Sequence, residues 1–143
     1  MAKSTAQKRK PKVRTYMQRS VEEAREKGYI ETLYGRRRYL PDITSRNAVV
    51  RGYAERNAVN APIQGTAADI IKVAMIRIDR ALQAEGLKTK MILQVHDELN
   101  FSVPLDELPR VRQIVVHEME HACALSVPLV ADCGEGANWL EAH

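Results

Sequence analysis

The spacing of apolar residues changes along the chain, and each spacing predicts a different element of secondary structure. Over residues 11–27 apolar side chains recur every three or four positions, which is the period of one helix face. They are Tyr16 or Met17, then Val21 and Ala24. Glycine ends many helices because it adopts left-handed backbone angles without strain. We therefore expect a helix that ends at Gly28.

Two short runs of strand-forming residues follow, at 29–33 and 36–40, with Gly35 between them. This pattern predicts a β-hairpin with Gly35 in its turn. Residues 44–60 favour a second helix. Pro62 is expected to kink or end that helix because proline lacks the backbone N–H.

The second half begins with a strongly amphipathic helix, expected over residues 66–86. Residues 90–95 and 99–103 are the expected strands of a second hairpin, whose tip carries the polar residues 96–98. A last helix and a short final strand at 127–131 complete the pattern.

Helices mixed with hairpins in this order indicate an α+β fold, in which antiparallel β-hairpins pack with long helices. We expect one domain over residues 11–143. Residues 1–10 are basic and show no periodicity, so we expect a disordered tail there.

Composition excludes several classes of protein. No apolar run approaches the roughly 20 residues that span a bilayer, and the polar start lacks the apolar stretch of a secretory signal. The two cysteines, Cys123 and Cys133, have no CxxC spacing. We expect free thiols in a reducing cytoplasm rather than a disulfide scaffold or a zinc site.

Charge is distributed unevenly between the two halves. Residues 1–64 hold 15 Lys and Arg against 6 Asp and Glu, whereas residues 65–143 hold 7 against 12. A basic region beside an acidic one suits a protein that holds a phosphate backbone near a carboxylate metal site. A solvated basic tail explains much of the same excess, because seven of the positive charges lie in the first 19 residues.

Asp97 and Glu98 are the first candidates for chemistry. Carboxylate oxygens are the ligands that Mg²⁺ prefers, and two-metal phosphoryl transfer needs such carboxylates. Neighbouring side chains on a strand point in opposite directions, so one acid would be a direct ligand and the other auxiliary. The plain alternative is a polar turn.

A row of hydrogen-bond donors is the second candidate. Its members, Arg56, Asn60 and Gln64, are four residues apart and share one helix face if the helix continues through Pro62. Such a row could contact the acceptors that every base pair presents in the minor groove. The alternative is a solvated helix face. The run Arg36–Arg38 could contact phosphates or simply lie in water.

One further motif indicates a different chemistry, namely zinc binding. Residues 117–121 read His-Glu-Met-Glu-His and fit the H-E-x-x-H pattern of zinc proteases. No third ligand is evident in the sequence, so a zinc hydrolase is only a remote alternative. A charged helix surface is the expected role.

Several segments, in order, resemble the C-terminal palm region of bacterial family A DNA polymerases. They are GYIETLYGRRRYLPD at 28–42, AERNAVNAPIQGTAAD at 54–69, LQVHDE at 93–98, VPL at 127–129 and NWLEAH at 138–143. The resemblance runs from about Pro11 to the last residue. It implies a partial palm fold and a DNA-directed DNA polymerase that extends a primer from deoxynucleoside triphosphates with two Mg²⁺ ions, in replication and repair. It also implies the bacterial cytoplasm, at the nucleoid.

The same resemblance assigns roles to single residues. Asp97 would be one of two metal-binding catalytic aspartates, Glu98 its auxiliary acid, and His96 a neighbour of the primer end. The donor row would contact primer–template DNA on its minor-groove side.

Parts of the family pattern are missing from this sequence. These are the D-Y-S-x-I-E-L-R segment with the other catalytic aspartate, and the R-x-x-x-K helix that holds the incoming triphosphate. We therefore expect that the chain alone does not synthesise DNA. We also expect it to expose apolar surface and to self-associate. A non-catalytic DNA-binding module is the alternative function.

Overall fold

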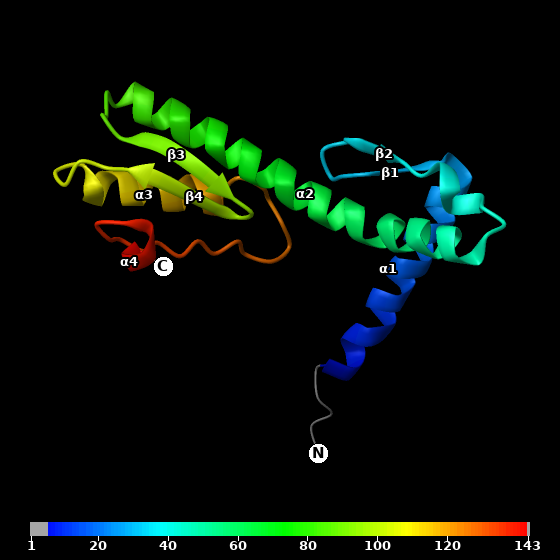
Figure 1. Ribbon diagram of the computed structural model, residues 1–143. Helices are drawn as coiled ribbons and strands as arrows, with labels where there is room; N and C mark the ends of the chain where they lie inside the picture. The colour runs from blue at the N-terminus through cyan, green and yellow to red at the C-terminus, as the bar shows by residue number, and fades with distance from the viewer. Residues whose placement is uncertain (1–5, 143) are drawn as a thin grey trace, which may run out of the picture. The chain divides into compact units, whose positions relative to one another are not determined.

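The structure is a computed structural model that describes residues 6–142 (Figure 1). Helices and two hairpins alternate along the chain, which confirms the expected α+β class. The elements are α1 (Ala6–Lys27), β1 (Tyr29–Glu31), β2 (Arg37–Tyr39), the 3₁₀ helix η1 (Pro41–Thr44), α2 (Ala48–Ala84), β3 (Lys90–Val95), β4 (Glu98–Ser102), α3 (Leu108–Glu120) and α4 (Trp139–Ala142). They form two compact units, Met1–Thr66 and Ala67–His143, each with its own core.

The first unit begins with a helix that ends where the sequence predicted. Gly28 has a φ of 78° and donates its N–H to the Ala24 carbonyl oxygen at 2.9 Å. The start differs from the prediction. Residues 6–10, expected as part of a disordered tail, are helical in α1 because Ala, Gln, Lys and Arg are all good helix formers. Residues 1–5 lie outside the described part of the chain.

The first hairpin is confirmed, with β1 and β2 antiparallel and Gly35 in the turn at a φ of 78°. Small residues dominate the core beneath it. The core members are Ala24, Ile30, Leu40, Ile43, Ala54, Ala58 and Ala61. The three alanines of α2 carry no bulk beyond Cβ, so the neighbouring backbones can approach the helix closely.

The hairpin turn is held to α2 by two hydrogen bonds, each between a backbone group and a side chain. The Leu33 N–H donates to Thr66 Oγ1 at 2.9 Å, and Arg36 Nη2 donates to the Gly65 carbonyl oxygen at 3.0 Å. A Cβ on Gly65 would lie 2.6 Å from Thr32 Cγ2, which is closer than such atoms can approach. Glycine is therefore required at position 65 for the turn to pack here.

The prediction that Pro62 would end or kink a helix was wrong about the ending. Residues 48–84 form a single helix of 37 residues with Pro62 inside it. A proline costs one backbone hydrogen bond, but the residues before it are buried in the first core and hold their turns in place. Packing therefore outweighs the local cost of the proline.

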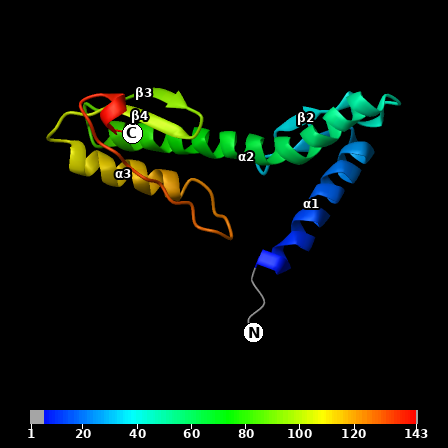
Figure 2. The same cartoon turned by 60° about the horizontal axis from the view of Figure 1, so that its bottom comes forward.

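The second unit packs the hairpin β3–β4 and α3 against the later part of α2 (Figure 2). The buried core is aliphatic and comes mainly from the two helices: Ala74, Ile78, Leu82, Val111, Ile114, Val115 and Ala122. Met91, Leu99 and Phe101 of the hairpin pack against it. The two strands are antiparallel, as predicted.

β3 contains one more residue than its partner strand uses. Met91 pairs with Phe101, whereas Leu93 pairs with Asn100, so Ile92 is left over as a bulge. The pairs that follow lead directly to the tip, and Val95 faces Glu98.

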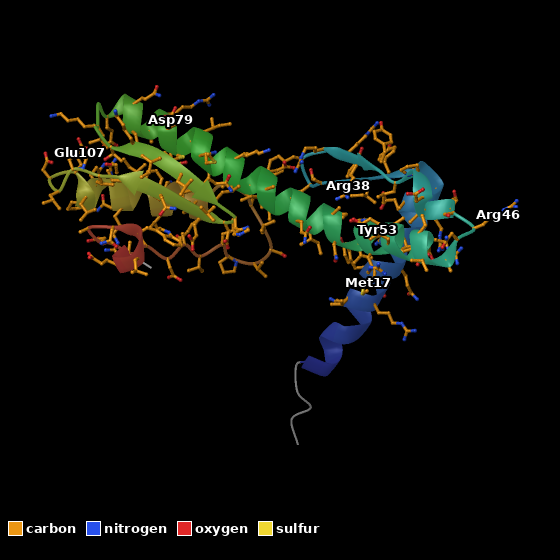
Figure 3. The ribbon with its side chains drawn as sticks, viewed as in Figure 1. Met17, Arg38, Arg46, Tyr53, Asp79 and Glu107 are labelled. Atoms are coloured by element: carbon orange, nitrogen blue, oxygen red, sulfur yellow. The ribbon has the colours of Figure 1, made fainter. Side chains whose placement is uncertain are left out.

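Glu107 connects the loop before β3 to the start of α3 (Figure 3). Its carboxylate accepts the backbone N–H of Lys88 at 2.8 Å, and the N–H and hydroxyl of Thr89 at 3.0 and 2.7 Å. These donors, led by the Lys88 N–H, hold the pKa of Glu107 below its ordinary value of 4.5. The charged form is therefore the one that the fold favours.

The predicted strand at 127–131 is absent, and the described residues 121–138 contain no strand or helix. Pro128 lacks the N–H for a ladder, and the Ala131 N–H donates instead to Glu120 at 3.1 Å. Arg112 of α3 holds this segment by donating to Glu135 at 2.7 Å and to the Cys133 carbonyl oxygen at 2.9 Å. Both cysteines are free thiols, as expected.

Apolar side chains are exposed on α2, as the sequence led us to expect of a partial domain. Those in the first unit include Val49, Tyr53 and Ile63. Self-association through such surface stays a prediction.

Among the described residues no helix has both the length and the apolar character that crossing a membrane requires.

Glu107→Gln should lower the melting temperature of the protein at pH 7, because an uncharged amide is a weaker acceptor for the three donors. A group with a depressed folded pKa stabilises above its unfolded pKa and loses that effect as pH falls through the folded pKa. The difference between wild type and variant should therefore shrink below about pH 4.5. Circular dichroism melts from pH 3 to 7 measure it, and a gap that widens in acid would contradict the assignment.

Candidate functional site

The acidic tip of the second hairpin is a two-residue loop, formed by His96 and Asp97 between β3 and β4. His96 has a φ of 52°, and it is the only residue other than glycine with a positive φ among residues 6–142. The side chain of Gln94 donates to the His96 carbonyl oxygen at 2.7 Å and so braces the loop. A left-handed residue at the first loop position matches the twist of the two strands.

This backbone conformation is costly for a residue with a side chain, although His tolerates it better than most. Strain of this kind is kept in proteins mainly where it positions something useful. In this loop the left-handed conformation of His96 reverses the chain direction. Asp97 is exposed at the tip, while Glu98 begins β4 and is half-buried. The two acids therefore have different surroundings, as their alternation predicted.

The Asp97 carboxylate has no ion-pair partner among the described residues, so its charge is not neutralised by a neighbouring cation. An exposed, unpaired carboxylate suits a hard divalent cation such as Mg²⁺. The described residues include no cluster of three or more His, Cys, Asp or Glu that could hold a metal ion. Asp97 and the adjacent Glu98 are therefore candidate ligands only, and their role stays a prediction.

The donor row lies in the first unit, on α2. Because the helix continues through Pro62, the condition for a shared face is met: Arg56, Asn60 and Gln64 are each four residues apart and each exposed. The Arg56 guanidinium lies 5.9 Å from the centre of the Tyr53 ring, a cation–π distance. Tyr53 is exposed on the same part of the helix (Figure 3).

A groove of about 520 Å³ runs beside this row, between α1 and α2. Met17, Val21 and Val59 supply apolar surface, and Arg56 and Asn60 also line it. Arg25 of α1 donates to Glu55 of α2 at 2.5 Å, which ties the two helices together at the groove. The donor row is therefore exposed to solvent on a helix that is held to α1 beside this groove.

The three consecutive arginines have separate roles. Arg36 donates to the Gly65 carbonyl oxygen, and Arg37 donates to Glu31 at 2.6 Å while lying 4.5 Å from the Tyr29 ring centre. Arg38 is exposed on β2 (Figure 3). Two of the three are thus engaged within the hairpin and the adjoining helix, and the run is not a free phosphate-binding cluster.

The comparisons with known proteins bear on what these residues serve. The sequence model described as DNA polymerase family A matches residues 4–141, which is nearly the whole chain. The chain belongs to DNA polymerase family A. The family membership confirms the resemblance that the hairpin and helix motifs carried.

Curated relatives agree with this family. DNA polymerase I of Streptococcus pneumoniae TIGR4 is 58% identical over 132 residues, covering 92% of this chain and 15% of its own length. DNA polymerase I of Bacillus subtilis 168 is 52% identical over 130 residues, covering 91% and 15%. The chain thus spans about a seventh of the length of these family A relatives.

A solved structure shows the same fold. The POL domain of Pol1 from M. smegmatis, in complex with DNA primer-template and dNTP, aligns with a TM-score of 0.88 at 50% identity. The alignment covers 90% of this chain and 23% of that one. The two hairpins and the helices therefore match a fragment of the polymerase domain of this family.

Sequence reasoning missed two residues that support the candidate positions. Gln94 braces the acidic loop from within β3, and Tyr53 lies under the Arg56 guanidinium. Tyr53 precedes Arg56 by three positions, a helical spacing that could have revealed it. No sequence signal marks Gln94, because its role follows from the positive φ of the residue it contacts.

His96→Val should destabilise the second unit by about 1–2 kcal/mol, because a β-branched side chain cannot adopt a positive φ without strain. His96→Asn is the matched control, since Asn adopts this conformation readily, and it should stay within about 0.5 kcal/mol of wild type. Urea unfolding followed by circular dichroism gives both values. Equal stability of the two variants would mean that the loop relaxes without a left-handed residue.

Proposed function

We propose that this chain is the C-terminal palm part of a DNA-directed DNA polymerase, a nucleotidyltransferase that adds deoxynucleotides to a primer under the direction of a template. The observation that carries the proposal is the exposed Asp97 on a strained two-residue loop, within the family segment at 93–98. Replication and repair are the processes that such an enzyme serves, and the bacterial cytoplasm, at the nucleoid, is the proposed location.

In this proposal Asp97 is a direct ligand for Mg²⁺ and Glu98 is the auxiliary acid. The metal would supply charge stabilisation for the attacking and leaving oxygens of phosphoryl transfer. The contribution of the chain is to hold the Asp97 carboxylate at a rigid tip, braced by Gln94, so that no reorganisation is needed when charge develops. His96, on the same loop, is placed beside the primer end.

The donor row is proposed to grip primer–template DNA from the minor-groove side. Asn60 and Gln64 can donate to the acceptors at purine N3 and pyrimidine O2, which every base pair presents. Contacts of this kind hold a duplex without selecting its sequence, as template-directed synthesis requires. The solved M. smegmatis relative was captured with primer-template and dNTP, which supports DNA and deoxynucleoside triphosphates as the partners.

Primer–template binding, measured by fluorescence anisotropy at several salt concentrations, tests the donor row. Asn60→Ala/Gln64→Ala should weaken binding without changing its salt dependence, because amides release no counterions. Arg56→Ala should weaken binding and also reduce the slope of log K against log salt by about 1, if Arg56 contacts a phosphate.

The control for this experiment removes two amides elsewhere. Gln83 and Gln113 are exposed in the second unit and take no part in the proposal. Gln83→Ala/Gln113→Ala should bind DNA as wild type does. Binding that is unchanged in the Asn60/Gln64 variant, or weakened equally in the control, would mean that the duplex contacts another surface.

Purified chain should not extend a primer with dNTPs and Mg²⁺. One carboxylate clamp of the two-metal site is missing from this sequence, and each ~1.4 kcal/mol of lost transition-state stabilisation is a tenfold loss in rate. A gel-based extension assay measures it, with Asp97→Ala as the control for contaminating polymerase. Extension by wild type that Asp97→Ala abolishes would show that the chain forms a complete catalytic site.

A further inference from the structure

The two histidines at the end of α3 are not used by the proposed polymerase function. His117 lies in the last turn of the helix and His121 is its C-cap residue, so they are four positions apart on one face. Both side chains are exposed. Their rings stack with centroids 4.2 Å apart and an interplanar angle of 26°.

The hydrogen bonding of His121 fixes which of its ring nitrogens is available. Nδ1 lies 2.8 Å from the His117 carbonyl oxygen. A carbonyl oxygen only accepts, so Nδ1 carries the hydrogen and the lone pair of the neutral ring is on Nε2. Metal-ligating histidines usually show this arrangement, with the second nitrogen donating to a carbonyl or carboxylate.

The ring spacing suits chelation by the pair. Two zinc–nitrogen bonds of roughly 2.0–2.1 Å at a tetrahedral angle place the nitrogens roughly 3.3 Å apart. Rings whose centroids lie 4.2 Å apart are close enough for two nitrogens to reach this separation once the side chains turn so that both Nε2 lone pairs point at one ion. Imidazole ligands favour Zn²⁺, Ni²⁺ and Cu²⁺ over hard cations such as Mg²⁺.

We propose that His117 and His121 form a two-imidazole chelate for a borderline divalent cation, Zn²⁺ in the first instance, at the C-terminal end of α3. Water completes the coordination, because the described residues bring no third protein ligand to the pair. The open, two-ligand site binds metal without the three-ligand arrangement of zinc hydrolases, so the H-E-x-x-H motif is expected to give binding and no hydrolysis.

Bound metal would link successive turns at the end of the helix. This end is already held to α2, because Arg77 Nη1 donates to the His121 carbonyl oxygen at 2.7 Å. A cation here also meets the partial negative charge of the helix C-terminus. Because the metal binds only the folded pair, it stabilises the second unit by mass action.

Isothermal titration of untagged chain with ZnCl₂ tests the site. Wild type should bind one zinc ion per chain, and His117→Gln or His121→Asn should each weaken binding by on the order of 10- to 100-fold, since one imidazole then acts alone. Zinc should raise the melting temperature of wild type and leave that of both variants unchanged. MgCl₂ should produce neither effect.

Three further variants locate the bound zinc. His96→Gln, Asp97→Asn and Cys123→Ser should each keep the wild-type affinity, and circular dichroism confirms that every variant is folded. The proposal is overturned if zinc affinity is unchanged in either helix-histidine variant, if it falls with Asp97 or Cys123 instead, or if wild type binds no zinc.

Discussion

Both cores of this protein depend on one helix, because α2 contributes buried side chains to each of them. In its first half the buried face is made of alanines at 54, 58 and 61, and in its second half of Ala74, Ile78 and Leu82. The face changes from small to large side chains along the same helix. Small residues allow the first hairpin to approach α2 closely, and larger residues fill the space beneath the second hairpin.

The candidate DNA-binding surface lies on the part of α2 that the cores leave exposed. The alanines at 54, 58 and 61 face inward, whereas Arg56, Asn60 and Gln64 lie on a different face of the same helix and are exposed. Because the alanine face of α2 is buried, the direction in which the exposed donor row points is fixed as well. Substitutions in the alanine face should disturb the donor row as well as stability, because a larger side chain there shifts the helix against α1.

Local patterns predicted the elements that are decided locally. Gly28 and Gly35 adopt the positive φ angles expected of them, and the two hairpins pair as their alternation indicated. Errors arose where distant residues decide the outcome. Pro62 is accommodated because the first core holds the preceding turns. Residues 127–131 have no strand to pair with among residues 6–142, whatever their own propensity.

The candidate chemistry divided in a similar way. Residue types and spacing singled out Asp97, Glu98 and the donor row as candidates, and family membership gives those positions a context that spacing alone could not, while their roles stay predictions. The positive φ of His96 and the brace from Gln94 could not be read from the sequence, because both depend on how the loop closes. The separate roles of Arg36 and Arg37 likewise depend on partners 29 and 6 residues away.

The bulge at Ile92 makes the number of residues in β3 a constraint in its own right. With the extra residue, Leu93 faces Asn100 and the tip falls at His96 and Asp97. Regular pairing beyond Met91, without the bulge, would instead bring Leu93 opposite Leu99 and move every later side chain of β3 to the other face. The loop would then fall at residues 95–97, although composition, charge and strand propensity would be unchanged. The bulge, and not the residue types of β3, therefore decides which way the acidic tip faces.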